Sequence, residues 1–478
     1  MRDGILLATI NAKWIHPSLA LRLLKANLGP LEERCAIVEF ALRQPLREKI
    51  EPILATEPRI LGLSVSIWNH TATLELLREL RKAWKGEGPL VVLGGPEVSY
   101  LPDDAEIFDY ADHRVLGEGE LAFRELCQAV YGADTDGRFL PGAKPVAAHE
   151  FGRVDPGSIK TGYGLYTDED LRGKLTYVES SRGCPYSCDF CLSARDKGVR
   201  EFPLEPFLDE MDTLVRRGAR TFKFLDRSFN LDIARAGRIM EFFLDRLERA
   251  RPFPDGNPPF TVHFEMVPFR FPPELVETIA RFPPGSLRLE IGIQTLNPDV
   301  SALVGRARDP EAGLEALRLL RLNTNAIVHA DLIAGLPGED MASFGRGFDL
   351  LWEALSPDKT LEPGIHPRVE IQLGILKLLP GAPIAGRSVA FGMSYDQAPP
   401  YEVTGTAALP AGDLDRIKNL ARFWEIVVNR GLADPGPSPV FDQFMTLADS
   451  LLARFGRNWG IAKADLVEAL SSRGFTGA

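Results

Sequence analysis

Three closely spaced cysteines constrain this chain more than any other feature of its sequence. Cys184, Cys188 and Cys191 are separated by three and two residues, and Gly183 and Pro185 favour an irregular loop over a helix. Three thiolates on one short loop can ligate three irons of a four-iron cluster. A structural zinc site needs a fourth Cys or His close by, and the loop offers none. The spacing therefore favours an iron–sulfur cluster with one iron open to a small ligand.

Length and charge limit the class of protein. A chain of 478 residues with ordinary apolar and charged fractions predicts a soluble globular protein of about three domains. The net charge is -11, with both signs interspersed, so there is no cationic field to hold DNA. The first residues lack a signal pattern, and no apolar run is long enough to span a membrane. We expect a cytoplasmic protein, in which Cys35 and Cys127 are small buried hydrophobes.

Residues 1–130 alternate between short apolar runs and amphipathic segments. The runs at 5–10, 35–42, 60–66, 89–95 and 114–117 are typical of buried strands, and 19–28 and 71–84 have helical spacing. This alternation predicts a doubly wound, Rossmann-like parallel sheet.

Ligands of such sheets bind beyond the carboxyl ends of the strands. Glycines there let the backbone approach a ligand, and serines can hydrogen-bond it, although the same residues also suit tight turns without a ligand. The Gly-x-Gly-x-x-Gly pattern is missing from the first turn, which disfavours a dinucleotide. The candidate ligand residues at these ends are Asn11, Ser64, Ser66, Trp68, Gly94, Gly95, Pro96, Glu97, Gly117, Glu118 and Gly119.

The remaining chain divides into three parts. Residues 131–175 have little periodicity and indicate a linker. Residues 176–379 resume the alternation, with strands expected at 176–181, 221–226, 260–267, 287–295, 326–335 and 369–378, which predicts a partial (β/α)6 barrel. The cysteine loop follows the first of these strands. Residues 380–478 predict a mostly helical cap, with helices at 413–430 and 441–454.

The motif Cys-x-x-x-Cys-x-aromatic-Cys, completed by Phe190, resembles that of the radical S-adenosylmethionine (SAM) family. The resemblance implies that the open iron of a [4Fe-4S] cluster binds SAM, and that reductive cleavage of SAM gives a 5′-deoxyadenosyl radical. It continues through "FKFLDRSFN", "VHFEMV", "LEIGIQTLNPDVSALVGR" and "DLIAGLPGED".

These segments carry five family positions. By resemblance, Asp226 and Ser228 contact the amino group of SAM, Glu265 is an acidic contact, Gln294 binds the ribose and Arg306 the carboxylate. All five residues could instead be structural. His263 and His329 lie in strands and are expected to be core histidines with satisfied hydrogen bonds.

The run from residue 60 to 120, with "LGLSVSIWNH", "VVLGGPEVSYLPDD" and "VLGEGELAFREL", resembles the cobalamin-binding domain of one branch of this family. The Asp-x-His-x-x-Gly motif, which supplies a histidine ligand in other cobalamin proteins, is missing from the sequence. The resemblance therefore implies a lower cobalt face that is free of that ligand, shielded by Trp68 or ligated by His70. The "PPYEV" segment resembles an uncharacterised C-terminal domain of such proteins.

The resemblance implies a cobalamin-dependent methyltransferase that acts on an unactivated centre of a small molecule. Its partners would be that substrate and a reductase or a flavodoxin or ferredoxin electron donor, without DNA or membrane. A radical rearrangement or cyclisation without methyl transfer is an alternative, and so is a non-catalytic electron-transfer or binding module. Methylthio transfer fits less well, because Cys35 and Cys127 cannot supply a second set of three ligands.

Overall fold

The computed structural model describes residues 3–84, 88–132, 147–253, 255–306, 309–356 and 369–472. The chain divides into two compact units. Unit 1 is Met1–Arg182 with Arg200–Lys223, and unit 2 is Gly183–Val199 with Phe224–Ala478. The boundaries predicted from the sequence at 130, 175 and 379 stay predictions, and residues 133–146 of the predicted linker lie outside the described residues.

Unit 1 contains the predicted doubly wound sheet. Its six strands pair in parallel in the order β2-β1-β3-β4-β5-β6, so the chain reverses its direction of winding at β1. Five of the strands coincide closely with those predicted. Their bounds are β1 Ile5–Asn11, β2 Cys35–Ala41, β3 Ile60–Ser64, β4 Leu90–Gly94, β5 His113–Val115 and β6 Ala147–His149.

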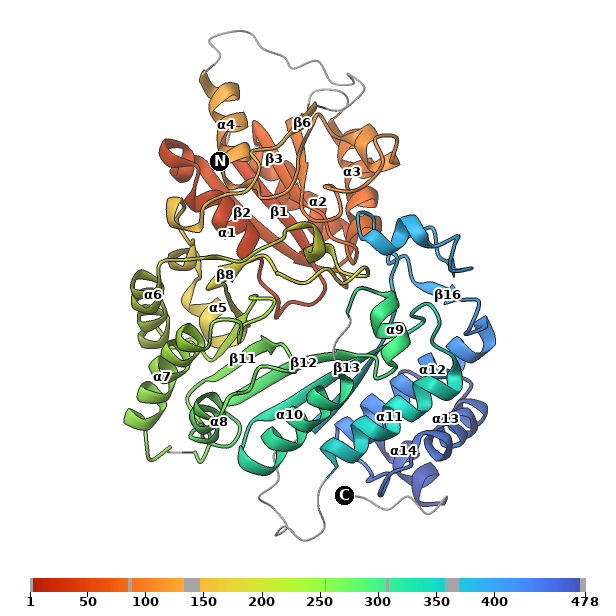
Figure 1. Cartoon of the computed structure of the whole chain (residues 1–478). Helices are drawn as coiled ribbons and strands as arrows, with labels where there is room; N and C mark the ends of the chain where they lie inside the picture. The colour runs from red at the N-terminus through yellow and green to blue at the C-terminus, as the bar shows by residue number, and fades with distance from the viewer. Residues whose placement is uncertain are drawn as a thin grey trace. The chain divides into compact units, whose positions relative to one another are not determined.

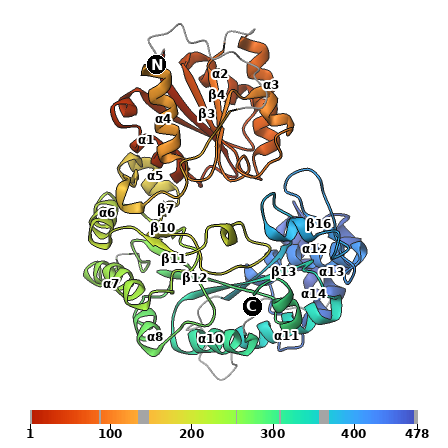
Figure 2. The ribbon, with the colours of Figure 1, turned by 45° about the horizontal axis from the view of Figure 1, so that its top comes forward.

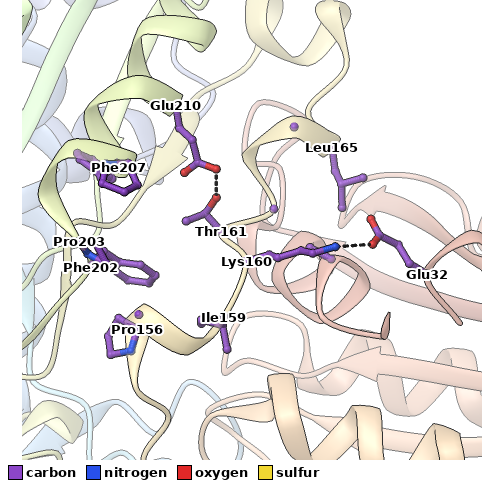
Figure 3. A pocket seen from close by; sticks show the side chains of 15 residues that line it. Glu32, Pro156, Ile159, Lys160, Thr161, Leu165, Phe202, Pro203, Phe207 and Glu210 are labelled. Atoms are coloured by element: carbon purple, nitrogen blue, oxygen red, sulfur yellow. Dashed lines mark hydrogen bonds and ion pairs between the residues drawn. The ribbon is translucent and has the colours of Figure 1, made fainter. Parts of the chain in front are cut away.

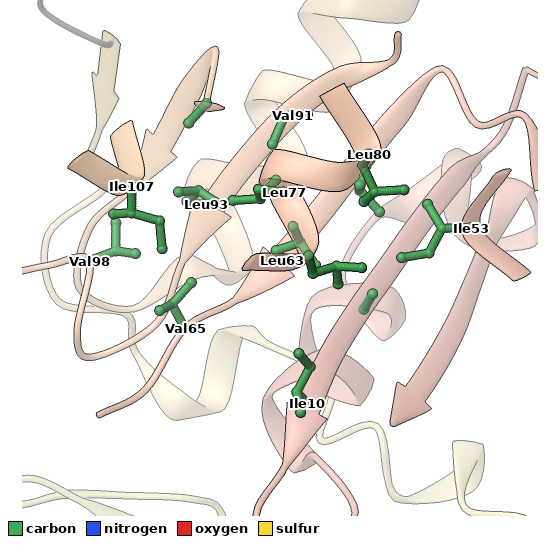
Figure 4. Close-up of a cluster of buried hydrophobic side chains, with 14 of the residues drawn as sticks. Ile10, Ile53, Leu63, Val65, Leu77, Leu80, Val91, Leu93, Val98 and Ile107 are labelled. Carbon is green, nitrogen blue, oxygen red and sulfur yellow. The ribbon is translucent and has the colours of Figure 1, made fainter. Parts of the chain in front are cut away.

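Both faces of this sheet are covered by helices (Figures 1 and 2). On one face, apolar side chains of the strands pack against α1 (Leu19–Ala26) and α4 (Gly119–Gly132). On the other, they pack against α2 (Leu46–Thr56) and α3 (His70–Trp84), and Figure 4 shows the resulting cluster. Since successive side chains of a strand point to opposite faces, strands buried on both faces need the continuous apolar runs seen in the sequence.

The region after α4 contains more regular structure than a linker. Its last described part includes β6, which pairs with β5, and α5 (Asp168–Gly173). Thr167 and Asp170 form a capping box at the start of α5, where each side chain accepts a hydrogen bond from the other residue's backbone. Tyr163 and Tyr166 are each 2% exposed. The sequence missed these elements because they are short and lack a sustained period.

The second sheet has the strand order β14-β13-β12-β11-β10-β7, and β10 spans the division between the units. All six predicted strands are present, and the four that belong to unit 2 pair in parallel. Their bounds are β7 Thr176–Val178, β10 Thr221–Phe224, β11 Thr261–Met266, β12 Leu287–Gln294, β13 Ile327–Ala334 and β14 Val369–Ile375.

Strands β11, β12 and β13 alternate strictly between fully buried and partly buried residues. The fully buried set is apolar, whereas the other set carries most of the polar side chains.

None of the helices among the described residues combines the length and the apolar character that a membrane span requires. The helices of this region are α6 Leu204–Arg216, α7 Ile233–Arg249, α8 Pro273–Ala280, α9 Pro298–Leu303, α10 Pro310–Asn323 and α11 Met341–Leu355.

The C-terminal segment is mostly helical, as predicted, with α12 Ala411–Trp424, α13 Phe441–Phe455 and α14 Lys463–Ser471. Trp424 packs edge-on against Phe348 of α11, with 4.7 Å between ring centroids. Gly345 of α11 faces the ring of Phe441, where a Cβ would lie 2.5 Å from a ring carbon. Asn429 exchanges hydrogen bonds with the backbone of Ile371 in β14. The cap thus shares an aromatic core with the barrel elements, and α13 lies beside α11 (Figure 1).

At the carboxyl edge of the first sheet, Gly95 and Gly117 differ in the physical reason that disfavours a side chain. Gly95 has φ +105°, and a Cβ there would lie 2.5 Å from the carbonyl oxygen of Val65. Gly117 has φ +65°, but a Cβ there would meet nothing within 4 Å. We expect Gly117→Ala to lower the free energy of unfolding by about 1 kcal/mol through φ alone. Gly95→Ala should cost at least about 1–3 kcal/mol more, because backbone must move.

Urea denaturation of both variants and the unmodified protein measures this difference. Equal losses in the two variants would contradict the steric role of Gly95.

Candidate functional site

The cysteine loop follows two short strands, β7 and β8 (Ser181–Arg182). Gly183 opens it with φ +86°, and a side chain at this position would collide with the carbonyl oxygen of Gly198. Within the loop, the Cys184 N–H donates to Asp196 O at 3.2 Å and the Cys191 N–H to Cys188 O at 3.0 Å. These backbone bonds close the loop that carries all three cysteines.

The donor set fits an iron–sulfur cluster better than a single ion. Among the described residues, no group of three or more His, Cys, Asp or Glu side chains could hold one metal ion. A four-iron cluster takes one thiolate on each iron, so its ligands need not converge on one point. Cys188 is 7% exposed, while Cys184 and Cys191 are half-buried. Phe190, also half-buried, lies in the turn before Cys191.

Arg306 lies against this loop. Its Nη1 donates to the Sγ of Cys188 at 3.4 Å, and its Nη2 donates to the carbonyl oxygen of Gly292. Burial raises the pKa of the Cys188 thiol, while the neighbouring Arg306 guanidinium works in the opposite direction. The structure thus brings a predicted SAM contact into direct contact with a predicted cluster ligand.

Gln294 ends β12 at an irregularity of the sheet. The register with β13 shifts between Gly292 and Gln294, and Gln294 has φ +70°. A Cβ on Gly292 would overlap the side-chain amide of Gln294. Because residue 292 is a glycine, the amide can lie back over the strand, on the side where Arg306 also lies.

The other three SAM candidates come from the ends of β10 and β11. Asp226 is 1% exposed, and the Oγ of Ser228 lies 3.6 Å from the Sγ of Cys184. Glu265 receives a hydrogen bond on its carbonyl oxygen from the Phe229 N–H at 2.9 Å, and its carboxylate lies 3.5 Å from Arg227 Nη1. These contacts place Ser228 at the cysteine loop and join Glu265 to the segment that follows β10.

The polar face of the barrel strands carries a network of charges. His329 lies 3.2 Å from both Asp331 and Glu370, and Arg288 bonds to Glu370. Burial would lower the pKa of His329, but the two carboxylates raise it to about 9. His263 Nε2 lies 3.0 Å from a carboxylate oxygen of Glu290. Both histidines are thus engaged by neighbouring side chains, as the sequence indicated.

The C-terminal segment also reaches the cysteine loop, which the sequence did not indicate. Arg387 pairs with the carboxylate of Asp189, and the Ile384 N–H donates to Asp189 O at 2.9 Å. The 3-10 turn Pro383–Arg387 carries both contacts. A basic residue in a polar segment has no sequence signal that would assign it this role.

In unit 1, a buried asparagine holds the carboxyl ends of β1 and β3 together. Asn69 is 1% exposed, donates to Ile10 O at 2.9 Å and accepts from the Ser66 N–H at 2.7 Å. Ser64 contributes its carbonyl oxygen to the same amide at 3.2 Å. Asn11, at the end of β1, donates to Glu39 at 3.1 Å. Sequence analysis did not select Asn69, although its position directly before α3 suits a polar capping role.

The same edge presents two aromatic side chains to solvent. Trp68, after β3, is 53% exposed, and Trp14, after β1, is 52% exposed. Gly94 and Gly95 end the neighbouring strand β4 and are followed by the exposed Pro96. Exposed indoles beside glycine turns can take a large, partly apolar ring, so this edge fits a corrin.

His70 opens α3 and is fixed by a carboxylate. Its Nδ1 lies 2.8 Å from an oxygen of Glu97, which is 2% exposed. A carboxylate at this position can accept a hydrogen bond from Nδ1 and so fix the orientation of the ring, with Nε2 on its other side.

The last predicted cobalamin residues follow β5. The Gly117 N–H donates to the Oγ of Ser99 at 3.0 Å, and Gly119 begins α4 close to the side chain of Leu24. The Glu118 carboxylate binds Arg200 through two hydrogen bonds of 2.7 and 2.9 Å. Burial would raise the pKa of Glu118, but its hydrogen bonds hold the pKa below the ordinary value.

Arg182, two residues before Cys184, extends this ion-pair network. It pairs with Glu179 at 2.6 Å and with Glu120 at 2.7 Å. Glu97 and Glu118 thus have internal partners at the edge, and their direct contact with cobalamin stays a prediction.

Unit 1 also contains a cavity of about 450 Å³ (Figure 3). Phe202 and Phe207 line it, and the Thr161 hydroxyl donates to Glu210 at 2.6 Å inside it. Burial raises the pKa of Glu210, and the bond from Thr161 opposes this. None of the candidate cofactor residues lines the cavity.

Two family models match the chain. Residues 5–127 match the B12 binding domain, and residues 178–351 match the Radical SAM superfamily. The chain therefore contains a Radical SAM domain and, before it in the sequence, a B12-binding domain. The Radical SAM domain implies a [4Fe-4S] cluster and SAM, and the B12 domain implies cobalamin.

Two curated proteins are similar to much of the chain. It is 28% identical over 360 residues to 2-(S-pantetheinyl)-carbapenam-3-carboxylate methyltransferase of Streptantibioticus cattleyicolor, covering 69% of this chain and 48% of that protein. It is 28% identical over 367 residues to the cobalamin-dependent radical SAM methyltransferase TokK of Streptomyces tokunonensis, covering 71% and 50%. The chain thus spans about half the length of the curated relatives it matches.

Solved structures share the fold. TsrM from Kitasatospora setae, a radical SAM methyltransferase with cobalamin and a [4Fe-4S] cluster bound, matches with a TM-score of 0.60 and 20% identity over 84% of this chain and 78% of that one. The cobalamin-dependent radical enzyme OxsB matches with a TM-score of 0.64 and 15% identity over 99% and 75%. At these identities the likeness supports the architecture.

The cysteine assignment makes a direct prediction. Cys184→Ala, Cys188→Ala and Cys191→Ala should each lose the visible absorbance of the cluster and all SAM cleavage, because each removes the ligand of one iron. Iron and sulfide analysis after anaerobic reconstitution measures the first effect. Cys35→Ala and Cys127→Ala are matched controls: both thiols are buried in unit 1, and burial raises the pKa of Cys35 to about 12. A full iron count in all three loop variants would disprove the assignment.

Proposed function

We propose that this protein is a cobalamin-dependent radical SAM methyltransferase that acts on an unactivated carbon or phosphorus centre of a small molecule. The cysteine loop in contact with Arg306 carries the proposal, because it joins a three-thiolate site to a forked cation in the segment after α9. The two curated relatives are methyltransferases, and one is named for a small carboxylate substrate.

The chain's own residues would bind and orient SAM at the cysteine loop. Ser228 and Asp226 suit its amino group, since both are buried polar groups and Ser228 lies beside Cys184. A guanidinium has five N–H donors, so Arg306 could bind the SAM carboxylate in addition to Cys188 and Gly292. Gln294 suits the ribose hydroxyls. Glu265 adds an acidic contact. When bound, the cluster supplies the electron for reductive SAM cleavage, and cobalamin supplies the methyl group.

Cobalamin would bind at the carboxyl edge of the unit 1 sheet. The backbone at Gly94, Gly95, Gly117 and Gly119 would approach it, and Ser64, Ser66 and Asn11 would offer hydrogen bonds. Trp68 would cover the lower face of cobalt and exclude water. We favour this shield over ligation by His70, because the Trp68 side chain is 53% exposed at this edge whereas that of His70 is 12% exposed.

Two other activities compete with methyl transfer. A radical rearrangement or cyclisation would use the same cofactors without moving a methyl group, and a non-catalytic module would bind SAM without consuming it. Methylthio transfer is disfavoured, because Cys35 and Cys127 are buried in unit 1 and supply only two thiols. Products formed from methyl-labelled SAM separate the first alternative, and release of 5′-deoxyadenosine separates the second.

The proposal includes the setting in which the enzyme works. The partners would be a low-potential reductase, flavodoxin or ferredoxin and a small-molecule substrate, in the cytoplasm and without DNA or membrane. Its domains would be 1–130 for cobalamin, 176–379 for the radical reaction and 380–478 as cap, joined through 131–175.

The basic test is turnover. The reconstituted protein with SAM, cobalamin and a strong reductant should release 5′-deoxyadenosine, and should release S-adenosylhomocysteine when cobalamin is remethylated. Binding of SAM without either product would favour the non-catalytic module.

Gly292→Ala tests the position of Gln294. The new methyl group would displace the Gln294 amide, so the dissociation constant of SAM should rise by roughly tenfold, or ~1.4 kcal/mol. The free energy of unfolding should change by less than about 1 kcal/mol, because only the end of a flexible side chain must move. Isothermal titration calorimetry measures the first quantity. Gly374→Ala on β14 is the control, since its Cβ would make an ordinary contact at 3.7 Å. Unchanged SAM affinity in Gly292→Ala would exclude Gln294 as a contact.

Trp68 and His70 can be distinguished spectroscopically. Cob(II)alamin bound to the unmodified protein should lack nitrogen coupling in its paramagnetic resonance spectrum, and Trp68→Ala should admit water as a lower ligand and shift the optical spectrum. His70→Ala should leave the spectrum as it was. A nitrogen-coupled signal that disappears in His70→Ala would show that histidine is the ligand.

A further inference from the structure

The guanidinium of Arg306 donates hydrogen bonds to two other described residues, and one acceptor is a sulfur atom. Nη1 donates to the Sγ of Cys188 at 3.4 Å, within the range for a hydrogen bond to sulfur, and Nη2 donates to the Gly292 carbonyl oxygen. Contact with the SAM carboxylate accounts for neither bond. The bond to Cys188 connects a permanent cation directly to a predicted ligand of the cluster.

The backbone around Arg306 holds this contact in place. The Arg306 N–H donates to Ser301 O at 2.8 Å, and the Ser301 hydroxyl returns a bond of 2.8 Å to Arg306 O. Gly305 has φ +68°, and a Cβ there would lie 2.6 Å from Ser187 O of the cysteine loop. The Asp189 N–H donates to Val304 O at 2.9 Å. The segment 304–306 therefore lies directly on the loop, with the arginine at its end.

We propose that Arg306 raises the reduction potential of the cluster by donating a hydrogen bond to the Cys188 sulfur; this rests on the cluster of the proposed function. One-electron reduction by a low-potential donor adds one negative charge to a thiolate-ligated cluster, and no bond forms or breaks. A neighbouring cation stabilises the reduced form more than the oxidised form. Since Cys188 is 7% exposed, water screens this interaction little.

A second cation on the same loop provides a matched comparison. Arg387 pairs with the carboxylate of Asp189, next in sequence to Cys188, so its charge is already balanced there. Its side chain is 45% exposed, and solvent screens it further. Removal of Arg387 should therefore change the potential far less than removal of Arg306.

The test is the midpoint potential of the cluster, measured without SAM so that carboxylate binding contributes nothing. Mediated redox titration of the reconstituted full chain, followed by the paramagnetic resonance signal of the reduced cluster, gives this value. In Arg306→Gln, the ratio of reduced to oxidised cluster at the unmodified midpoint should fall at least about tenfold, which is about 59 mV for one electron. Arg306→Lys keeps the charge but loses the fork, so its ratio should fall measurably but less. Arg387→Gln should keep the unmodified value.

An unchanged midpoint in each Arg306 variant that assembles a full cluster overturns the proposal. If Arg306→Gln does not assemble one, Arg306→Lys decides alone, and a midpoint equal to that of the unmodified protein overturns it. An equal fall in Arg387→Gln also overturns it, since any loop cation would then suffice. Failure of the unmodified protein to assemble a cluster would instead refute the proposed function.

Discussion

The contact between the cysteine loop and the segment after α9 is the interaction on which the site depends. The loop donates a backbone hydrogen bond to Val304 O. Gly305 lets the two segments approach so closely that any side chain at this position would collide with Ser187 O. The segment is the continuation of β12 and α9, so this approach ties the loop to the sheet, and Ser228 and Arg387 contact the loop at other points. Arg306 and Gln294 then occupy fixed places on the strand side of the loop.

The two units build their ligand edges in different ways. In unit 1, the side chain of Asn69 replaces ladder hydrogen bonds beyond the ends of β1 and β3, and ion pairs of Arg182 and Arg200 hold the turn after β5. In unit 2, a register shift within β12 produces the edge, and a glycine makes room for it. A strand can thus end in a polar site either because a side chain replaces missing backbone bonds or because the strand itself is irregular.

The sequence predicted the sheets well and the polar contacts poorly, for physical reasons. Strands buried on both faces leave apolar runs, as in β1, β3 and β4. Barrel strands such as β11, β12 and β13 instead alternate between buried apolar and partly buried residues, which is also a strand pattern, so β1 to β5 and all six barrel strands were found. Short elements such as β6 and α5 leave no period, and the sequence indicated a linker there. The three cysteines lie close together in the sequence, so their spacing alone indicates a shared ligand site. By contrast, the ion pair of Arg387 with Asp189 joins residues that are far apart in the chain, and no local pattern encodes it.

The aromatic packing of the cap limits where the chain can be truncated without exposing the core of the barrel. Phe348 and Trp352 of α11 are 0% and 5% exposed only because Trp424 and its neighbours lie on them, and Gly345 leaves the space that Phe441 fills. A chain cut after β14 would present this hollowed, aromatic strip to water, where large apolar patches promote self-association. It would also lose Arg387 from the cysteine loop. The C-terminal segment is thus part of the barrel's own core, and a minimal version of the radical domain has to include it.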